Sequence, residues 1–196
     1  MPASYGLAVL VDNEKFRRRT RGFMGITYVA VPSLIGWIIQ SIWVSQNMLN
    51  RHADSPAVDW TDGSKFGLPF AVYVFFGIEY ACWQITCQYI LATLTNDPQL
   101  LARYSGVFRA GIAAGECVSF GIDSTLLSFK TEVIVYFTLS AIGIIILYSV
   151  CYWKTTETNY FAEENVIVPL QVVKNVRGIR PEIQDGEPVF MEEIAD

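Results

Sequence analysis

The chain has 196 residues, of which 52% are hydrophobic and 17% are charged, and its formal net charge is −5. A soluble domain usually carries about a quarter charged residues, so this composition favours a membrane protein. The acidic balance argues against a nucleic-acid partner, because phosphate binding needs a basic surface. The cysteines lack the spacing of zinc ligands and fall within apolar stretches, so we expect free thiols and no metal site at Cys82, Cys87, Cys117 and Cys151. No nucleophile–base pair or phosphate-binding loop is recognisable, so we expect neither an enzyme nor a cofactor.

The N-terminal region, residues 1–22, combines a short apolar run with a basic cluster. The run at residues 5–11 is too short to span a bilayer, and it is either the end of a further helix or a short interfacial segment. Positive charge beside a span marks the cytoplasmic side of a membrane. We therefore expect a helix remnant followed by a cytoplasmic loop that holds Lys15, Arg17, Arg18, Arg19 and Arg21.

Four long apolar stretches follow the basic cluster, and each reaches the roughly 20 residues that a transmembrane helix needs. The predicted spans form one transmembrane domain, residues 23–153, and run at about 23–44, 68–91, 104–126 and 132–153. The acidic tail, residues 154–196, holds three prolines, and we expect it to be mostly disordered. Segments predicted inside carry ten Lys and Arg residues and those outside carry three, which places the loop and the tail in the cytoplasm. The fold class is an all-α membrane protein that forms a helical bundle.

The first span contains Pro32, which removes a backbone hydrogen bond and predicts a kink, with Gly36 one turn later. Ser33 and Gln40 lie seven residues apart and share a face. These features fit either a polar seam between helices or a hinge for a conformational change. The fourth span has no charge between its ends, so we expect it to be peripheral and to face lipid.

Ionisable residues lie inside the second and third spans. Glu79 is near the middle of the second span, and Arg109, Glu116 and Asp123 follow one another at intervals of seven in the third. Seven residues return to within roughly 20° on a helix, so the last three form one polar stripe. Burial in lipid disfavours a charged carboxylate, so at least one glutamate is expected to be protonated in one state and to release its proton in another. The alternative is that these side chains only hold helices together.

Three segments carry a resemblance to a known family. They are residues 19–25 (RTRGFMG), residues 59–64 (DWTDGS) and residues 104–111 (YSGVFRAG), the last followed by Gly115 and Glu116. The chain resembles, over roughly residues 5–155, the C-terminal portion of fungal Unc-93-like proteins, a branch of the major facilitator superfamily. The resemblance implies that the four spans are helices nine to twelve of a twelve-helix fold, and that residues 5–11 end helix eight.

The same resemblance implies a cytoplasmic loop motif, with Asp12 as its aspartate and Arg18, Arg19 or Arg21 as its arginines; the spacing is looser than the usual pattern. Only four full spans are present, so we expect a fragment that needs a missing N-terminal half or a second chain. The implied function is that of a transmembrane transporter, a secondary carrier for which proton coupling is one option. The alternative is a non-transporting accessory protein that regulates an ion channel or receptor trafficking. The expected surroundings are the lipid bilayer and a membrane protein partner.

Overall fold

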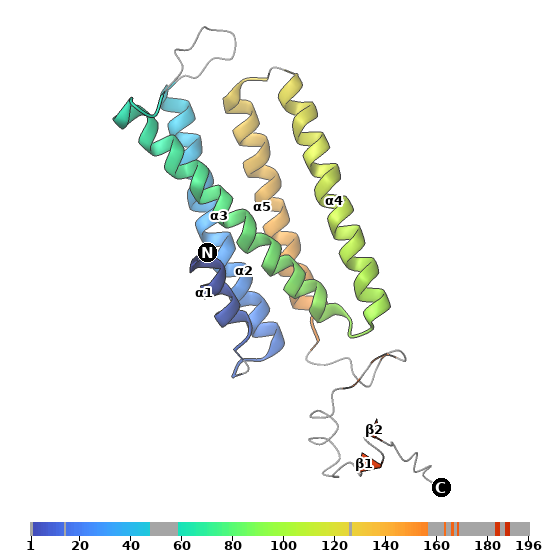
Figure 1. Cartoon of the computed structure of the whole chain (residues 1–196). Coiled ribbons are helices and arrows are strands. Elements are labelled where there is room, and N and C mark those ends of the chain that lie inside the picture. The colour runs from blue at the N-terminus through green and yellow to red at the C-terminus, as the bar shows by residue number, and fades with distance from the viewer. Residues whose placement is uncertain are drawn as a thin grey trace.

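The described part of the chain is helical apart from one very short strand pair. The computed structural model describes residues 2–13, 15–47, 59–125 and 127–156, and in the tail residues 163, 166, 168, 183–184 and 187–188. The two strands, β1 (Ile183–Gln184) and β2 (Glu187–Pro188), pair antiparallel. The five helices are α1 (Pro2–Val11), α2 (Arg18–Asn47), α3 (Gly63–Leu94), α4 (Pro98–Ser124) and α5 (Phe129–Lys154), as Figure 1 shows.

Three of these helices are long and apolar enough to cross a membrane, over Arg18–Gln46, Lys65–Leu94 and Phe129–Lys154. They support the prediction of an integral membrane protein. Helix α4 has the length of a span with its 27 residues, but its apolar character is interrupted by Arg103, Arg109, Glu116 and Asp123. That α4, the third predicted span, crosses the membrane therefore stays a prediction, as does the division into a remnant plus four spans. Most of the tail that we expect to be disordered lies outside the described residues.

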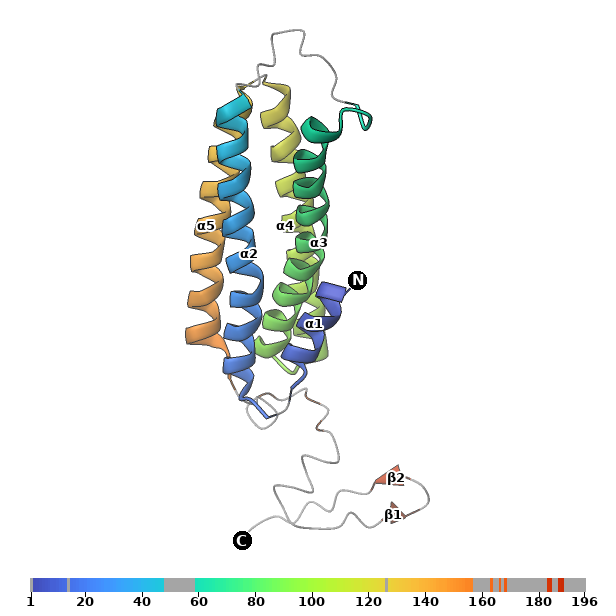
Figure 2. The ribbon, with the colours of Figure 1, turned by 90° about the vertical axis from the view of Figure 1, so that its left-hand side faces the viewer.

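Helix α2 is the centre of the bundle and packs against α1, α3 and α5. Figure 2 shows α5 on one side of α2 and α1 with α3 on the other. The buried positions of α2 recur at the helical period, which is the pattern of an amphipathic helix facing a core. Two apolar clusters result: one joins α2 and α3 to α5, and the other joins them to α1. The first contains Ile26, Ala30, Ile90, Ile144 and Cys151, and the second contains Leu7, Val11, Val29 and Cys82.

Glycines on the buried face of α2 allow this close packing. A Cβ on Gly22 would lie 2.7 Å from Cys151 Sγ of α5, and a Cβ on Gly36 would lie 2.5 Å from Phe75 Cε1 of α3. Neither distance is compatible with an undisturbed contact, so both positions need the absence of a side chain. Gly36 thus has a packing role between α2 and α3. Pro32 lies within the continuous α2 helix, and a kink there stays a prediction.

The fourth predicted span, α5, buries only four of its 26 residues, as suits a peripheral helix, but it is not the least buried helix of the described bundle. Helix α5 buries Ile144 and Cys151 against α2, whereas α4 buries none of its described residues. The physical reason is that two small residues, Gly22 and Cys151, meet where α2 and α5 cross, and this lets the helices approach closely. Figure 1 shows α4 at the margin of the bundle, joined to α3 by a short connection.

Candidate membrane-embedded site and the basic end of the bundle

Glu79 is buried between α3 and α2, with only 6% of its surface exposed. The Ser33 hydroxyl of α2 and the Trp83 indole, one turn along α3, are near enough to influence its carboxylate. Neither carboxylate oxygen, however, makes a hydrogen bond of acceptable geometry. An ionised carboxylate here would lack the partners that a buried charge needs, and its burial would cost several kcal/mol. The buried Glu79 carboxylate would therefore be stabilised by a bound proton, a nearby cation or a rearranged hydrogen-bond partner.

The neighbours of Glu79 on α3 continue a buried polar stripe. Thr86, seven residues further on, is buried as the sequence spacing indicates, and its hydroxyl donates to the Cys82 carbonyl oxygen at 3.0 Å. Ser33, on the predicted polar face of α2, is also buried. Ser33 and Gln40, predicted to share a face of α2, have different surroundings. Ser33 is buried near Glu79, whereas Gln40 lines a pocket of about 190 Å³ nearer the C-terminal end of α2. That pocket is lined by Gln40, Trp43, Pro69, Val72, Tyr73 and Phe76.

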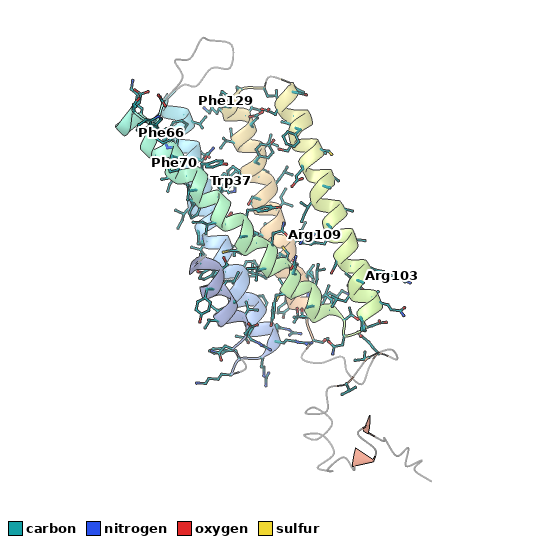
Figure 3. The ribbon with its side chains drawn as sticks, viewed as in Figure 1. Trp37, Phe66, Phe70, Arg103, Arg109 and Phe129 are labelled. Atoms are coloured by element: carbon teal, nitrogen blue, oxygen red, sulfur yellow. The ribbon has the colours of Figure 1, made fainter. Side chains whose placement is uncertain are left out.

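The polar stripe of α4 is exposed, as is most of that helix. Arg109, Glu116 and Asp123 are all exposed, and Figure 3 shows Arg109 and Arg103 on this marginal helix. The two glutamates therefore have different surroundings: Glu79 is enclosed in a helix contact, whereas Glu116 is open. The sequence places both glutamates within predicted spans but does not distinguish an enclosed carboxylate from an open one.

The basic cluster ties the start of α2 to neighbouring helix ends. The Arg21 guanidinium donates to the carbonyl oxygen of Val11, the last residue of α1, at 3.1 Å. The Arg18 guanidinium is 3.5 Å from Asn96 Oδ1 in the connection between α3 and α4. Asp12 is exposed, and its amide donates to the Ala8 carbonyl oxygen at 2.8 Å. We call this end of the molecule the basic end; it holds residues 15–21.

Arg19 reaches the last turn of α5 and the residue that follows it. Its guanidinium donates to the Thr155 carbonyl oxygen at 3.2 Å and lies 5.9 Å from the centre of the Tyr152 ring. The Thr155 hydroxyl is 3.2 Å from the Thr93 hydroxyl of α3. The three arginines named for the loop motif thus contact three different helix ends. The roles that the resemblance implies for them stay predictions.

One contact at the basic end had no signal in the sequence. A single carboxylate oxygen of Glu163, in the tail, accepts hydrogen bonds from the connection between α3 and α4. Nothing distinguishes Glu163 from the other acidic residues of the tail until the fold is known. Asn96–Asp97–Pro98, by contrast, is a recognisable helix start, because Asp is a common N-cap and Pro is favoured at the first helical position.

Cys82 and Cys151 are buried, Cys117 is exposed, and all four cysteines are free thiols. Within the described residues, no group of three or more His, Cys, Asp or Glu side chains is arranged to hold a metal ion.

Comparison with known proteins gives relatives but no family model and no solved structure that matches. An uncharacterized membrane protein of Schizosaccharomyces pombe is 32% identical over 160 residues, which are 82% of this chain and 31% of that protein. UNC93-like protein 1 of Arabidopsis thaliana is 28% identical over 166 residues, 81% of this chain and 35% of the relative. An UNC93-like protein of S. pombe is 25% identical over 167 residues, 83% of this chain and 32% of the relative.

The chain therefore spans about a third of the length of the curated relatives that it matches. These relatives support the resemblance to Unc-93-like proteins that the sequence motifs indicate. Over about four fifths of its length, the chain is similar to membrane proteins named UNC93-like.

Proposed function

We propose that this chain is the C-terminal part of a secondary carrier of the major facilitator type, and that the polar stripe of α4 lines the substrate pathway. The observation that carries the proposal is the exposure of Arg109, Glu116 and Asp123 on the least buried helix. Charged side chains facing lipid would be costly, and in membrane proteins they usually face a water-filled cavity or another helix. The greater length of the relatives supports a further segment, or a second chain, on the other side of that pathway.

In this proposal the basic end and the tail are cytoplasmic, as the distribution of Lys and Arg indicates. Glu79 is the coupling residue: it holds a proton while α2 and α3 enclose it, and it releases the proton when those helices separate. Glu116 is the carboxylate that meets the substrate or a second ion in the open pathway.

A specific observation favours a second candidate, a non-transporting accessory protein. Glu79 is enclosed by Ser33 and Trp83 rather than open to a pathway. A regulator of a channel or of receptor trafficking can tolerate a glutamate that only forms part of a helix contact. In that case the exposed stripe of α4 would be a contact surface for the regulated membrane protein.

Cysteine accessibility separates the two candidates. Glu116→Cys, made in a background without the four native cysteines, is treated in membranes with a hydrophilic, membrane-impermeant thiol reagent. Ile145→Cys is the matched control, because Ile145 is 65% exposed on α5 but lies in an uncharged stretch that we expect to face lipid. A carrier predicts labelling at position 116 and none at position 145. Absence of labelling at position 116 from either side would reject a hydrated pathway along α4.

The role of Glu79 is tested by the pH dependence of the conformation. The reagent's reaction rate with the exposed Cys117, kept as the only cysteine, reports the exposure of α4. Dividing the rate in Glu79→Gln by the rate in the parent at each pH removes the intrinsic pH dependence of the thiol. A ratio that changes with pH supports coupling through Glu79. A constant ratio removes Glu79 from that role, and Glu116→Gln then tests the other carboxylate in the same way.

A further inference from the structure

Three donors converge on one carboxylate oxygen at the basic end. The connection between α3 and α4 consists of Thr95, Asn96 and Asp97. The Thr95 hydroxyl, the Asn96 amide and the Asp97 amide donate to Glu163 Oε2 at 2.8, 2.8 and 2.9 Å. Glu163 lies 66 to 68 residues away along the chain, so this contact closes a long loop through the tail.

The position of the connection, directly before a helix, explains why it binds a carboxylate. The first amides of a helix have no partner within the helix, and the positive end of the helix dipole favours negative charge there. The Asp97 carboxylate accepts from the amides of Gln99 and Leu100 at 2.8 and 3.4 Å. Glu163 accepts from the two amides just before the helix, and the Asp97 amide is shared with the Thr95 hydroxyl oxygen at 3.1 Å. Hydrogen bonds to a charged acceptor are roughly twice as strong as neutral ones.

The start of the tail is held beside this connection. Thr155, directly after α5, receives the Arg19 guanidinium on its carbonyl oxygen, and its hydroxyl meets the Thr93 hydroxyl at the end of α3. Arg18 also approaches Asn96, so the start of α2 contributes a positive charge near the Glu163 carboxylate. The carboxylate therefore docks at a point that α2, α3 and α5 all fix.

Helix α4 is held against α5 by polar contacts in its second half. None of its described residues is buried, and the Ser119 and Tyr136 hydroxyls lie 2.8 Å apart across the two helices. That contact is in the half of α4 farthest from the basic end. The other half of α4 begins at the connection to α3, to which Glu163 is hydrogen-bonded.

We propose that Glu163 is a latch, by which the C-terminal tail holds the basic end of α4 against the bundle. While the carboxylate is docked, α4 stays beside α5 and α3. When it leaves, α4 can swing about the Ser119–Tyr136 contact. The latch does not depend on whether the protein transports a substrate, because it concerns only how the tail restrains α4.

The hydrogen bonds are tested by amide hydrogen exchange of the full chain in lipid nanodiscs. We expect Glu163→Ala to speed exchange of the Asn96 amide by about ten- to a hundredfold, the range expected for charge-assisted hydrogen bonds. The Asp97 amide should accelerate less, because it keeps the Thr95 hydroxyl oxygen as an acceptor. Glu163→Gln, which keeps an acceptor without the charge, should give a smaller increase. The matched control is Glu164→Gln, which removes the same charge from the neighbouring residue and so reveals any effect of the total charge of the tail. Unchanged exchange in Glu163→Ala, or equal acceleration in the control, would overturn the proposal.

The restraint itself is tested by spin labels on α4 and α5. Labels replace Val107 and Ile146, which are 74% and 57% exposed. The distribution of distances between them should broaden in Glu163→Ala and stay narrow in Glu164→Gln. Faster exchange without broadening would show that Glu163 caps the connection but does not restrain α4, and would reject the latch. If Glu163→Ala loosens the whole bundle, Glu163→Gln is used to decide. A broader distribution of label distances in Glu163→Gln, with normal amide exchange in α5, supports the latch. An unchanged distribution of label distances rejects it.

Discussion

Replacing Gly36 with alanine should weaken the packing of α2 against α3. The new Cβ would be 2.5 Å from Phe75 Cε1 and 3.4 Å from Phe76 Cζ. Phe75 cannot turn away freely, because its ring packs edge-on against Phe76 with centroids 5.6 Å apart. Phe76 in turn packs on Trp37 with centroids 4.8 Å apart. The added methyl group therefore has to displace a chain of three aromatic rings.

The magnitude follows from two opposed effects. Inserting a methyl group into a packed core costs about 1–3 kcal/mol. Alanine also favours a helix over glycine by about 0.5–1 kcal/mol. Gly77→Ala, on α3, is the matched control, because a Cβ there meets nothing within 4 Å and only the helical gain applies. The difference in unfolding free energy between the two variants isolates the packing cost, and we expect about 1–3 kcal/mol.

The assay is reversible unfolding of the chain in mixed micelles, with the two variants compared at the same protein and detergent concentrations. A second pair of measurements identifies the clashing ring. Phe75→Leu should remove most of the penalty in combination with Gly36→Ala, giving a positive coupling in the double-mutant cycle. If Gly36→Ala is as stable as Gly77→Ala, α2 and α3 do not approach as closely as described, and the reasoning fails.

Three further substitutions test other contacts. Gly22→Val should separate α5 from α2, because a Cβ at position 22 would lie only 2.7 Å from Cys151 Sγ. Crosslinking between α2 and α5 should therefore fall. Gly121→Val is the control and should leave crosslinking unchanged, because a Cβ at position 121 meets nothing within 4 Å. Tyr136→Phe removes the 2.8 Å contact with Ser119 and should cost about 0.5–1.5 kcal/mol in unfolding free energy, whereas Tyr5→Phe, at an exposed ring, should cost nothing measurable. Asp97→Ala removes the N-cap of α4 and should cost about 1 kcal/mol, with Asp97→Asn nearly neutral; equal losses in both would show that charge rather than capping matters.

The helices were predictable because their cause is local. Apolar length predicted a helix within each of α2, α3, α4 and α5. Helix α4 begins earlier than the predicted 104, because Asp97 caps it and Pro98 suits its first position. The spacing of Arg109, Glu116 and Asp123 also gave their shared face, because the helical period depends only on the backbone. All three are exposed, as is most of α4, so the functional role of the stripe stays a prediction.

Which helix lies at the margin was not predictable from apolar content. An uncharged helix suits lipid on one side, but α5 also packs on α2 through Cys151 and Gly22, and this fit depends on residues more than 120 positions apart. The enclosure of Glu79 was not predictable for the same reason, because its neighbour Ser33 belongs to another helix. Glu163 shows the extreme case, because its partners are two backbone amides and a hydroxyl that no sequence pattern links to the tail.

The contacts of Arg19 and Arg21 have a consequence for the response of the protein to its surroundings. Both guanidinium groups donate to main-chain carbonyl oxygens, those of Thr155 and Val11. A guanidinium keeps its charge throughout the physiological range, and a peptide oxygen neither gains nor loses a proton there. Acidification of the compartment at this face would leave both arginine–carbonyl hydrogen bonds intact. A response of this face to acidity would therefore arise at other side chains, while the two arginine contacts keep the ends of α1 and α5 attached to the start of α2.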